Sequence, residues 1–80
     1  MNETALINSA QTGDLDAFNT LVLHYQDAVF NTAVRILGDE DMAQDAAQEA
    51  FISAFQSIRS FRGGSFKAWI LRTVTNACLD

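Results

Sequence analysis

The chain has 80 residues and a formal net charge of −5, from ten acidic and five basic residues, with one histidine, one cysteine and no proline. This length allows one small domain at most, and a single cysteine outside any His/Cys cluster excludes an internal disulfide and argues against a metal site. The acidic total by itself argues against nucleic-acid binding, which usually accompanies a basic one.

The first half of the sequence predicts two helices. A short helix over residues 3–12 begins at Asn2 or Thr4, and Gly13 can end it in a left-handed conformation. A long helix over residues 14–37 follows, capped by Asp14 and ended by Gly38. Its apolar residues recur at three-, four- and seven-residue intervals, the spacing of one buried helical face.

The third helix, predicted over residues 41–59, has two different sides. Asp39 or Asp41 opens it, where a helix favours acids. An inward stripe combines small alanines with two phenylalanines: Ala43, Ala47, Ala50, Phe51, Ala54, Phe55 and Ile58. At about 100° per residue, an opposite side gathers Asp45, Gln48, Glu49, Ile52 and Gln56. This side is either solvated or a docking surface, since an isoleucine among acids and amides suits a positively charged protein partner.

A loop and a fourth helix complete the chain. Gly63 and Gly64 allow backbone conformations closed to other residues, and Ser65 can cap a helix over residues 65–80. One side of this helix is apolar: Phe66, Ile70, Leu71, Val74, Ala77 and Cys78. The other side carries Ala68, Arg72, Thr75, Asn76 and Leu79, with Trp69 at the border. The sequence therefore predicts an all-α fold, a compact bundle of about four helices in a single domain, residues 1–80.

Signals for an enzyme, a cofactor or a membrane protein are weak. His24 lies within a helix and has no neighbouring serine or cysteine to activate. Asp39–Asp41 lacks the spaced oxygen ligands and the glycine of a calcium loop, and the Gly-Gly pair is not part of a phosphate-binding loop. No apolar run approaches the roughly 20 residues of a membrane span, and no secretion signal begins the chain. We therefore expect a cytoplasmic, non-enzymatic protein without cofactor, metal or membrane insertion.

Charge is distributed unevenly along the chain. Residues 57–80 hold four of the five basic residues and the single tryptophan, whereas residues 39–49 hold five acids and no base. Arginines attract phosphates, aromatic rings stack on exposed bases, and the Asn76 amide can bond a base edge. Residues such as Phe61 and Trp69 are, however, more often core than stacking platforms, and an asparagine such as Asn76 is more often a plain surface residue. The residues alone thus leave two interpretations open, a nucleic-acid-binding surface and a helical protein-interaction domain without nucleic-acid binding.

Two motifs in order carry a resemblance to a known family. DAAQEAFISAFQSI, preceded by Asp39–Asp41, is followed by SFRGGSFKAWILRTVTNACLD. Together they resemble region 2 of bacterial sigma factors, the extracytoplasmic-function group in particular, most densely over residues 35–80. The resemblance implies a module for promoter recognition and melting. It covers one domain of such a factor, whose C-terminal promoter-reading domain we expect to be absent from this chain.

The resemblance also implies partners and site residues. In this family the third helix binds the clamp helices of the largest subunit of core RNA polymerase, a role that motif position gives to Asp45, Gln48, Glu49 and Ile52. The loop and final helix bind the non-template strand of the minus-ten promoter element, and the loop holds a base turned out of the stack. These positions are Phe61, Arg62, Gly63, Gly64, Ser65, Lys67, Arg72 and Asn76. Trp69 is expected to pack the last helix against the third.

Two departures from the family limit DNA affinity. Family members usually carry a basic run after the last aspartate and a basic residue near the end of the third helix, where this chain has Ser53 and Gln56. We therefore expect these 80 residues to bind promoter DNA only on the polymerase. An anti-sigma factor is a further expected partner, for which Ile52 and the loop aromatics offer part of a surface.

Overall fold

The computed structural model describes all of residues 1–80 as a helical bundle. Its elements are α1 (Glu3–Gln11), α2 (Leu15–Leu37), α3 (Glu40–Ser57), the 3₁₀ turn η1 (Ile58–Ser60) and α4 (Phe66–Leu79). No strand is present, so the predicted all-α fold is confirmed. None of the helices combines the length and the apolar character that crossing a membrane requires.

Each helix begins at a side chain that accepts a backbone N–H from three residues further on. These bonds satisfy donors that the first helical turn leaves free. The caps are Asn2, Asp14, Asp39 and Ser65, at donor–acceptor distances of 3.1, 3.2, 2.8 and 3.0 Å. At the other end of α2, Gly38 has a φ of 70°, which favours glycine. Because these signals are local in sequence, every predicted helix start lies within one residue of the observed start.

The end of the third helix was predicted wrongly. The α-helical part stops at Ser57, and the expected last residues tighten into η1. Two serine hydroxyls donate hydrogen bonds to backbone carbonyls there: Ser57 to Ser53 at 2.7 Å, and Ser60 to Ser57 at 2.6 Å. Such bonds offer the backbone an alternative to a continued α-helix.

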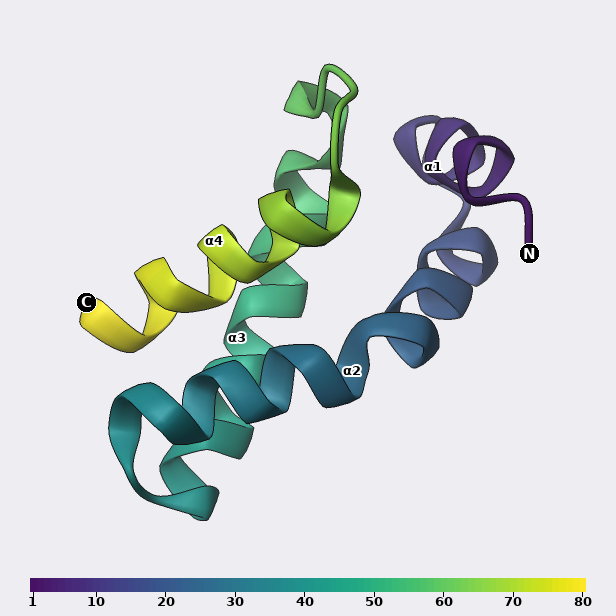
Figure 1. Cartoon of the computed structure of the whole chain (residues 1–80). Helices are drawn as coiled ribbons and strands as arrows, with labels where there is room; N and C mark the ends of the chain where they lie inside the picture. The colour runs from purple at the N-terminus through teal and green to yellow at the C-terminus, as the bar shows by residue number, and fades with distance from the viewer.

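The long helix α2 is the element against which the others pack. Figure 1 shows α1 folded back at the N-terminal end of α2, with α3 and α4 further along it. Both α3 and α4 contact α2 and each other. The loop that joins η1 to α4 lies at the end of the bundle near α1. This arrangement places the loop and α4 beside α3 in one small body of 35 × 20 × 19 Å.

The core is entirely apolar, and α3 contributes only alanines to it. All 16 buried residues are hydrophobic. Those of α3 are Ala43, Ala46, Ala47, Ala50 and Ala54, facing larger residues of α2 and α4 such as Leu21, Val29, Ile70 and Val74. Small side chains let α3 lie close to two neighbours at once. Cys78, on the apolar side of α4, is half-buried, and this burial raises the pKa of the thiol.

Candidate nucleic-acid and polymerase interfaces

The loop Phe61–Ser65 has a shape that depends on its two glycines. Gly63 and Gly64 have φ values of 102° and 81°, a region that residues with a Cβ rarely adopt. An added Cβ would meet nothing within 4 Å at either position. The glycines are therefore needed for their backbone conformation and not for space. Ser65 then starts α4, so the loop is short and its ends are defined.

A cluster of aromatic rings packs against the start of this loop. Phe61 contacts Trp69 and Phe66, each with ring centroids 5.6 Å apart, and Phe66 continues to Tyr25 at 5.5 Å. Phe66 is buried, whereas Phe61 and Trp69 are half-buried. The ring partners of Trp69 thus belong to the loop and to α4 itself. Phe61 is thus part of this cluster and also partly exposed at the loop.

Two open hollows flank the loop. The first, of about 390 Å³, lies between α1 and the loop and is lined by Glu3, Thr4, Ile7, Asn8, Gln11, Phe61, Arg62, Gly63, Gly64 and Phe66. The second, of about 420 Å³, lies between the loop and α4 and is lined by Ser60, Phe61, Arg62, Gly63, Ser65, Ala68, Trp69 and Arg72. Phe61, Arg62 and Gly63 line both, so the loop forms a wall between them.

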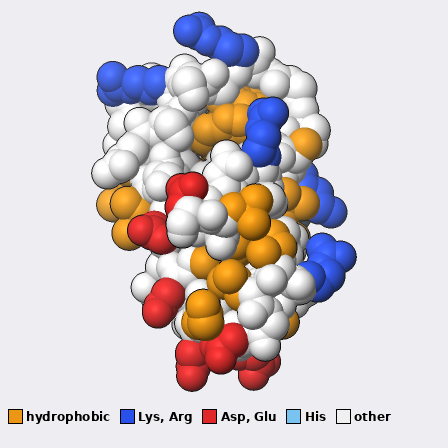
Figure 2. Space-filling model, turned by 90° about the vertical axis from the view of Figure 1, so that its left-hand side faces the viewer, with side chains coloured by type: hydrophobic (Ala, Val, Ile, Leu, Met, Phe, Trp, Pro, Cys, Tyr) orange, Lys and Arg blue, Asp and Glu red, His pale blue; other side chains and the backbone are white.

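The predicted polymerase-binding residues lie on one exposed face of α3. Asp45, Gln48, Glu49 and Ile52 are all exposed, and Ile52 keeps 60% of its surface open to solvent. Ile52 is one of seven large hydrophobic side chains that the molecule exposes, and it is the one that lies among the predicted polymerase-binding residues. Figure 2 shows acidic side chains gathered toward the end of the molecule where α2 joins α3, and basic ones at the opposite end and along one edge.

Comparison with known proteins identifies the family. The sequence matches the family Sigma-70 region 2 over residues 21–80. The chain belongs to this sigma-70 region 2 family. The resemblance found in the two sequence motifs is therefore confirmed.

The relatives include several sigma factors. The chain is 44% identical over 72 residues to the RNA polymerase sigma-H factor of Pseudomonas aeruginosa, covering 89% of this chain and 37% of that protein. It is 42% identical over 77 residues to the ECF RNA polymerase sigma-E factor of Haemophilus influenzae, covering 95% and 40%. The chain thus spans about two fifths of the length of these curated relatives.

A solved structure has the same fold. It is an engineered region 2 of sigmaE in complex with GTAAAA, which matches with a TM-score of 0.90 and 34% sequence identity. The match covers 99% of this chain and 83% of that one. The similarity therefore includes α1 and the first part of α2, which precede the family match at residue 21.

The predicted DNA-binding residues of this sigma region 2 do not all share one hollow. Arg72 lines the hollow between the loop and α4, whereas Asn76, one helical turn further on, lines a separate hollow of about 320 Å³ between α3 and α4. Glu49 and Asp80 also line this hollow between α3 and α4. Lys67 is exposed on the first turn of α4. Asn76 therefore has carboxylates nearby, which oppose the approach of a phosphate.

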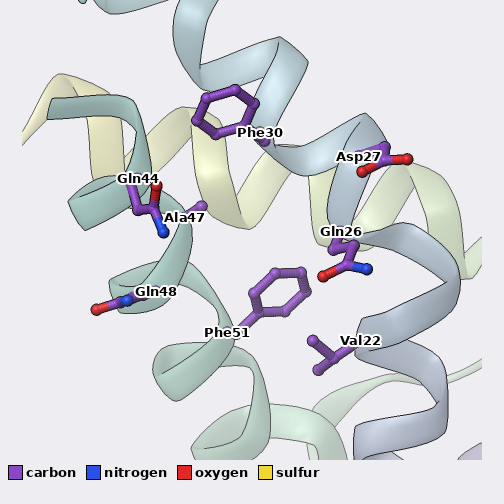
Figure 3. A pocket seen from close by; sticks show the side chains of 8 residues that line it. All are labelled: Val22, Gln26, Asp27, Phe30, Gln44, Ala47, Gln48 and Phe51. Atoms are coloured by element: carbon purple, nitrogen blue, oxygen red, sulfur yellow. The ribbon is translucent and has the colours of Figure 1, made fainter. Parts of the chain in front are cut away.

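Sequence reasoning missed a groove between α2 and α3. Two adjoining hollows of about 410 and 480 Å³ share Val22, Gln48 and Phe51 and continue as far as Ile52. Figure 3 shows Val22 of α2 beside Phe51 of α3, and Phe30 further along α2 toward Ala47 and Gln44. The groove is thus continuous with the exposed face of α3.

The groove also borders the predicted core stripe of α3. Phe51 and Phe55, expected to face inward, are half-buried: both pack against the core, Phe55 on Phe18 with ring centroids 5.0 Å apart, and both also line the groove. They lie about 60–140° around the helix from the alanines Ala43, Ala50 and Ala54, at the edge of the stripe. This angular offset from the alanines is the sequence signal that both phenylalanines lie at the edge of the stripe.

No three His, Cys, Asp or Glu side chains come together as a metal would require.

Proposed function

We propose that this region 2 domain is the promoter recognition and melting module of an extracytoplasmic-function sigma factor. In this proposal α3 binds the clamp helices of core RNA polymerase, and the loop with α4 binds the non-template strand of the minus-ten element. The observation that carries it is the family match together with the arrangement of the two motifs. They form adjoining surfaces of one bundle, because α3 packs directly on α4.

The polymerase-binding role of α3 is supported by charge and shape. Asp45 and Glu49 offer negative charge beside the apolar Ile52, and the groove next to them exposes Phe51. A positively charged coiled coil with apolar side chains fits both features. Exposed carboxylates of this kind set the rate and orientation of docking more than the affinity, so we assign the affinity to Ile52 and the groove.

The DNA-binding role of the loop and α4 divides into phosphate and base contacts. Arg62, Lys67 and Arg72 are exposed cations suited to the strand backbone. The half-exposed ring of Phe61, at the wall between two hollows, suits a base removed from the stack, whose extrusion costs a few kcal/mol that stacking partly returns. For Asn76 we propose a base-edge contact, since the carboxylates around it disfavour phosphate.

Because the net charge of −5 repels DNA, we infer that the domain binds the polymerase before it binds the promoter strand. Docking on the polymerase through α3 comes first and covers acidic side chains. The basic residues of the loop and α4 then meet the strand that the polymerase holds nearby. A protein that works beside RNA polymerase in this way is cytoplasmic, and an anti-sigma factor that covers Ile52 would block the first step. A second promoter-reading domain would lie outside residues 1–80.

The proposal is tested by replacing Arg72 and Asn76 with alanine in the full-length factor that carries this domain. Promoter-dependent transcription with core polymerase should fall at least about tenfold, since a base-specific contact contributes about 1–3 kcal/mol, while affinity for core polymerase stays unchanged. Asn31 and Arg35 provide a matched control, being an exposed asparagine and arginine four residues apart on α2. Unchanged transcription in the Arg72/Asn76 variant would instead favour a protein-interaction domain without nucleic-acid binding.

A further inference from the structure

The end of α1 is hydrogen-bonded to the start of the loop. The side-chain amide of Gln11 donates to the carbonyl oxygens of Ile58, at 3.0 Å, and Phe61, at 2.9 Å. These bonds join residues 47 and 50 positions apart, and the Gln11 side chain is partly buried. One amide thus holds both ends of the tight turn η1.

A third hydrogen bond runs in the opposite direction. The Arg59 Nε–H donates to the backbone oxygen of Gln11 at 3.0 Å. This oxygen lies at the C-terminal end of α1, where carbonyl groups lack helical partners and a positive charge is favoured. Arg59 is therefore engaged in holding α1, although it belongs to the basic segment of the sequence.

The position of α1 depends in turn on α2. A nine-residue helix is not stable alone in water, and α1 is fixed by burial of Ile7 and Ala10 and by a hydrogen bond from the Tyr25 hydroxyl to Glu3. Because Gln11 belongs to α1, its two hydrogen bonds fix the start of the loop relative to α1 and α2. Beyond Phe61 the loop contains Gly63 and Gly64, whose backbones can adopt more conformations than those of other residues.

We propose that Gln11 is a positioning residue for the DNA-binding loop. By fixing the carbonyl of Phe61, it holds the Phe61 ring against Trp69 at the wall between the two hollows. This inference rests on the proposed function of the loop in binding an unpaired base. It assigns to α1, which lies outside both family motifs, a part in DNA opening through the position of the loop.

The decisive variants are Gln11→Met, which keeps the length of the side chain but removes both donors, and Gln11→Glu, which turns a carboxylate toward two carbonyls. In holoenzyme made from the full-length factor, open-complex formation at a cognate promoter should fall about tenfold, the effect of losing two ordinary hydrogen bonds. Affinity for core polymerase should not change. Asn31→Asp, an exposed amide-to-carboxylate change on α2, should alter neither.

The single tryptophan, read together with helical circular dichroism, separates a local change at the loop from a general loss of structure. Trp69 contacts Phe61, so its fluorescence should shift to longer wavelength in Gln11→Met, while the helical circular dichroism of the 80-residue chain is retained. Unchanged open-complex formation and fluorescence in Gln11→Met would overturn the inference, as would parallel losses in core binding and opening. If instead the unmodified holoenzyme failed to open promoters, the proposed function itself would fail.

Discussion

Replacing Gly64 with alanine tests the physical basis of the loop. Gly64 has a φ of 81°, and no atom lies within 4 Å of an added Cβ, so the cost is purely conformational. A left-handed backbone costs an L-residue about 1–2 kcal/mol. Alanine also stabilises by about 0.4–1 kcal/mol through the unfolded chain. The net loss for L-alanine should therefore be about 0–1.6 kcal/mol.

D-alanine at the same position separates these two effects. It adopts positive φ without strain and keeps the unfolded-state benefit, so a synthetic protein with D-alanine in place of Gly64 should be about 0.4–1 kcal/mol more stable than the natural chain. Urea unfolding followed by Trp69 fluorescence would measure both variants. A change of about 1 kcal/mol corresponds to a Tm shift of about 4–8 °C in a domain of this size. Equal stabilities of the L- and D-alanine proteins would refute the argument that backbone conformation fixes the loop.

Three further predictions concern the other surfaces. Burial, reinforced by the hydrogen bond and negative charge of Glu3, raises the pKa of Tyr25 from 10.0 to about 12. The protonated hydroxyl therefore stabilises the fold below pH 10, and this stabilisation is lost between pH 10 and about 12. The free energy of unfolding should fall more steeply in this range for the unmodified chain than for Tyr25→Phe, which urea unfolding at several pH values would show. Reversing Asp45 and Glu49 to lysine should slow binding to core polymerase in surface-plasmon measurements, most at low salt, whereas Asp16→Lys on α2 should not. The isolated 80-residue chain should not bind duplex DNA at micromolar concentration and physiological salt in an anisotropy titration; tighter binding would contradict the order of events inferred from its charge.

Much of the fold could be predicted because its signals are local. Asp14 and Ser65 cap the helices that follow them directly, and Gly38 ends the helix that precedes it. The error at the end of α3 arises where residues distant in the sequence add to local hydrogen bonds. The tie from Gln11 to Ile58 and Phe61, across 47 and 50 residues, helps to hold the turn that ends α3, and no pattern near residue 58 reveals it.

The candidate site was predictable to a similar degree. Helical spacing correctly placed the exposed face of α3 and the polar side of α4. It could not show that Phe51 faces a groove, because the width of a core stripe depends on where the neighbouring helix lies. Nor could it show that Asn76 and Arg72 line different hollows, since α3 supplies the wall beside Asn76.

The alanine stripe of α3 has a consequence for how such domains can diverge. Positions such as Ala43, Ala50 and Ala54 are fully enclosed, so any larger residue there must force α2 and α4 apart. Exposed residues such as Arg62 and Lys67 have no comparable restriction. Under the proposed function, duplicated copies of this domain could therefore acquire new promoter preferences at the loop while the alanine side of α3, and with it the packing of the bundle, stays unaltered.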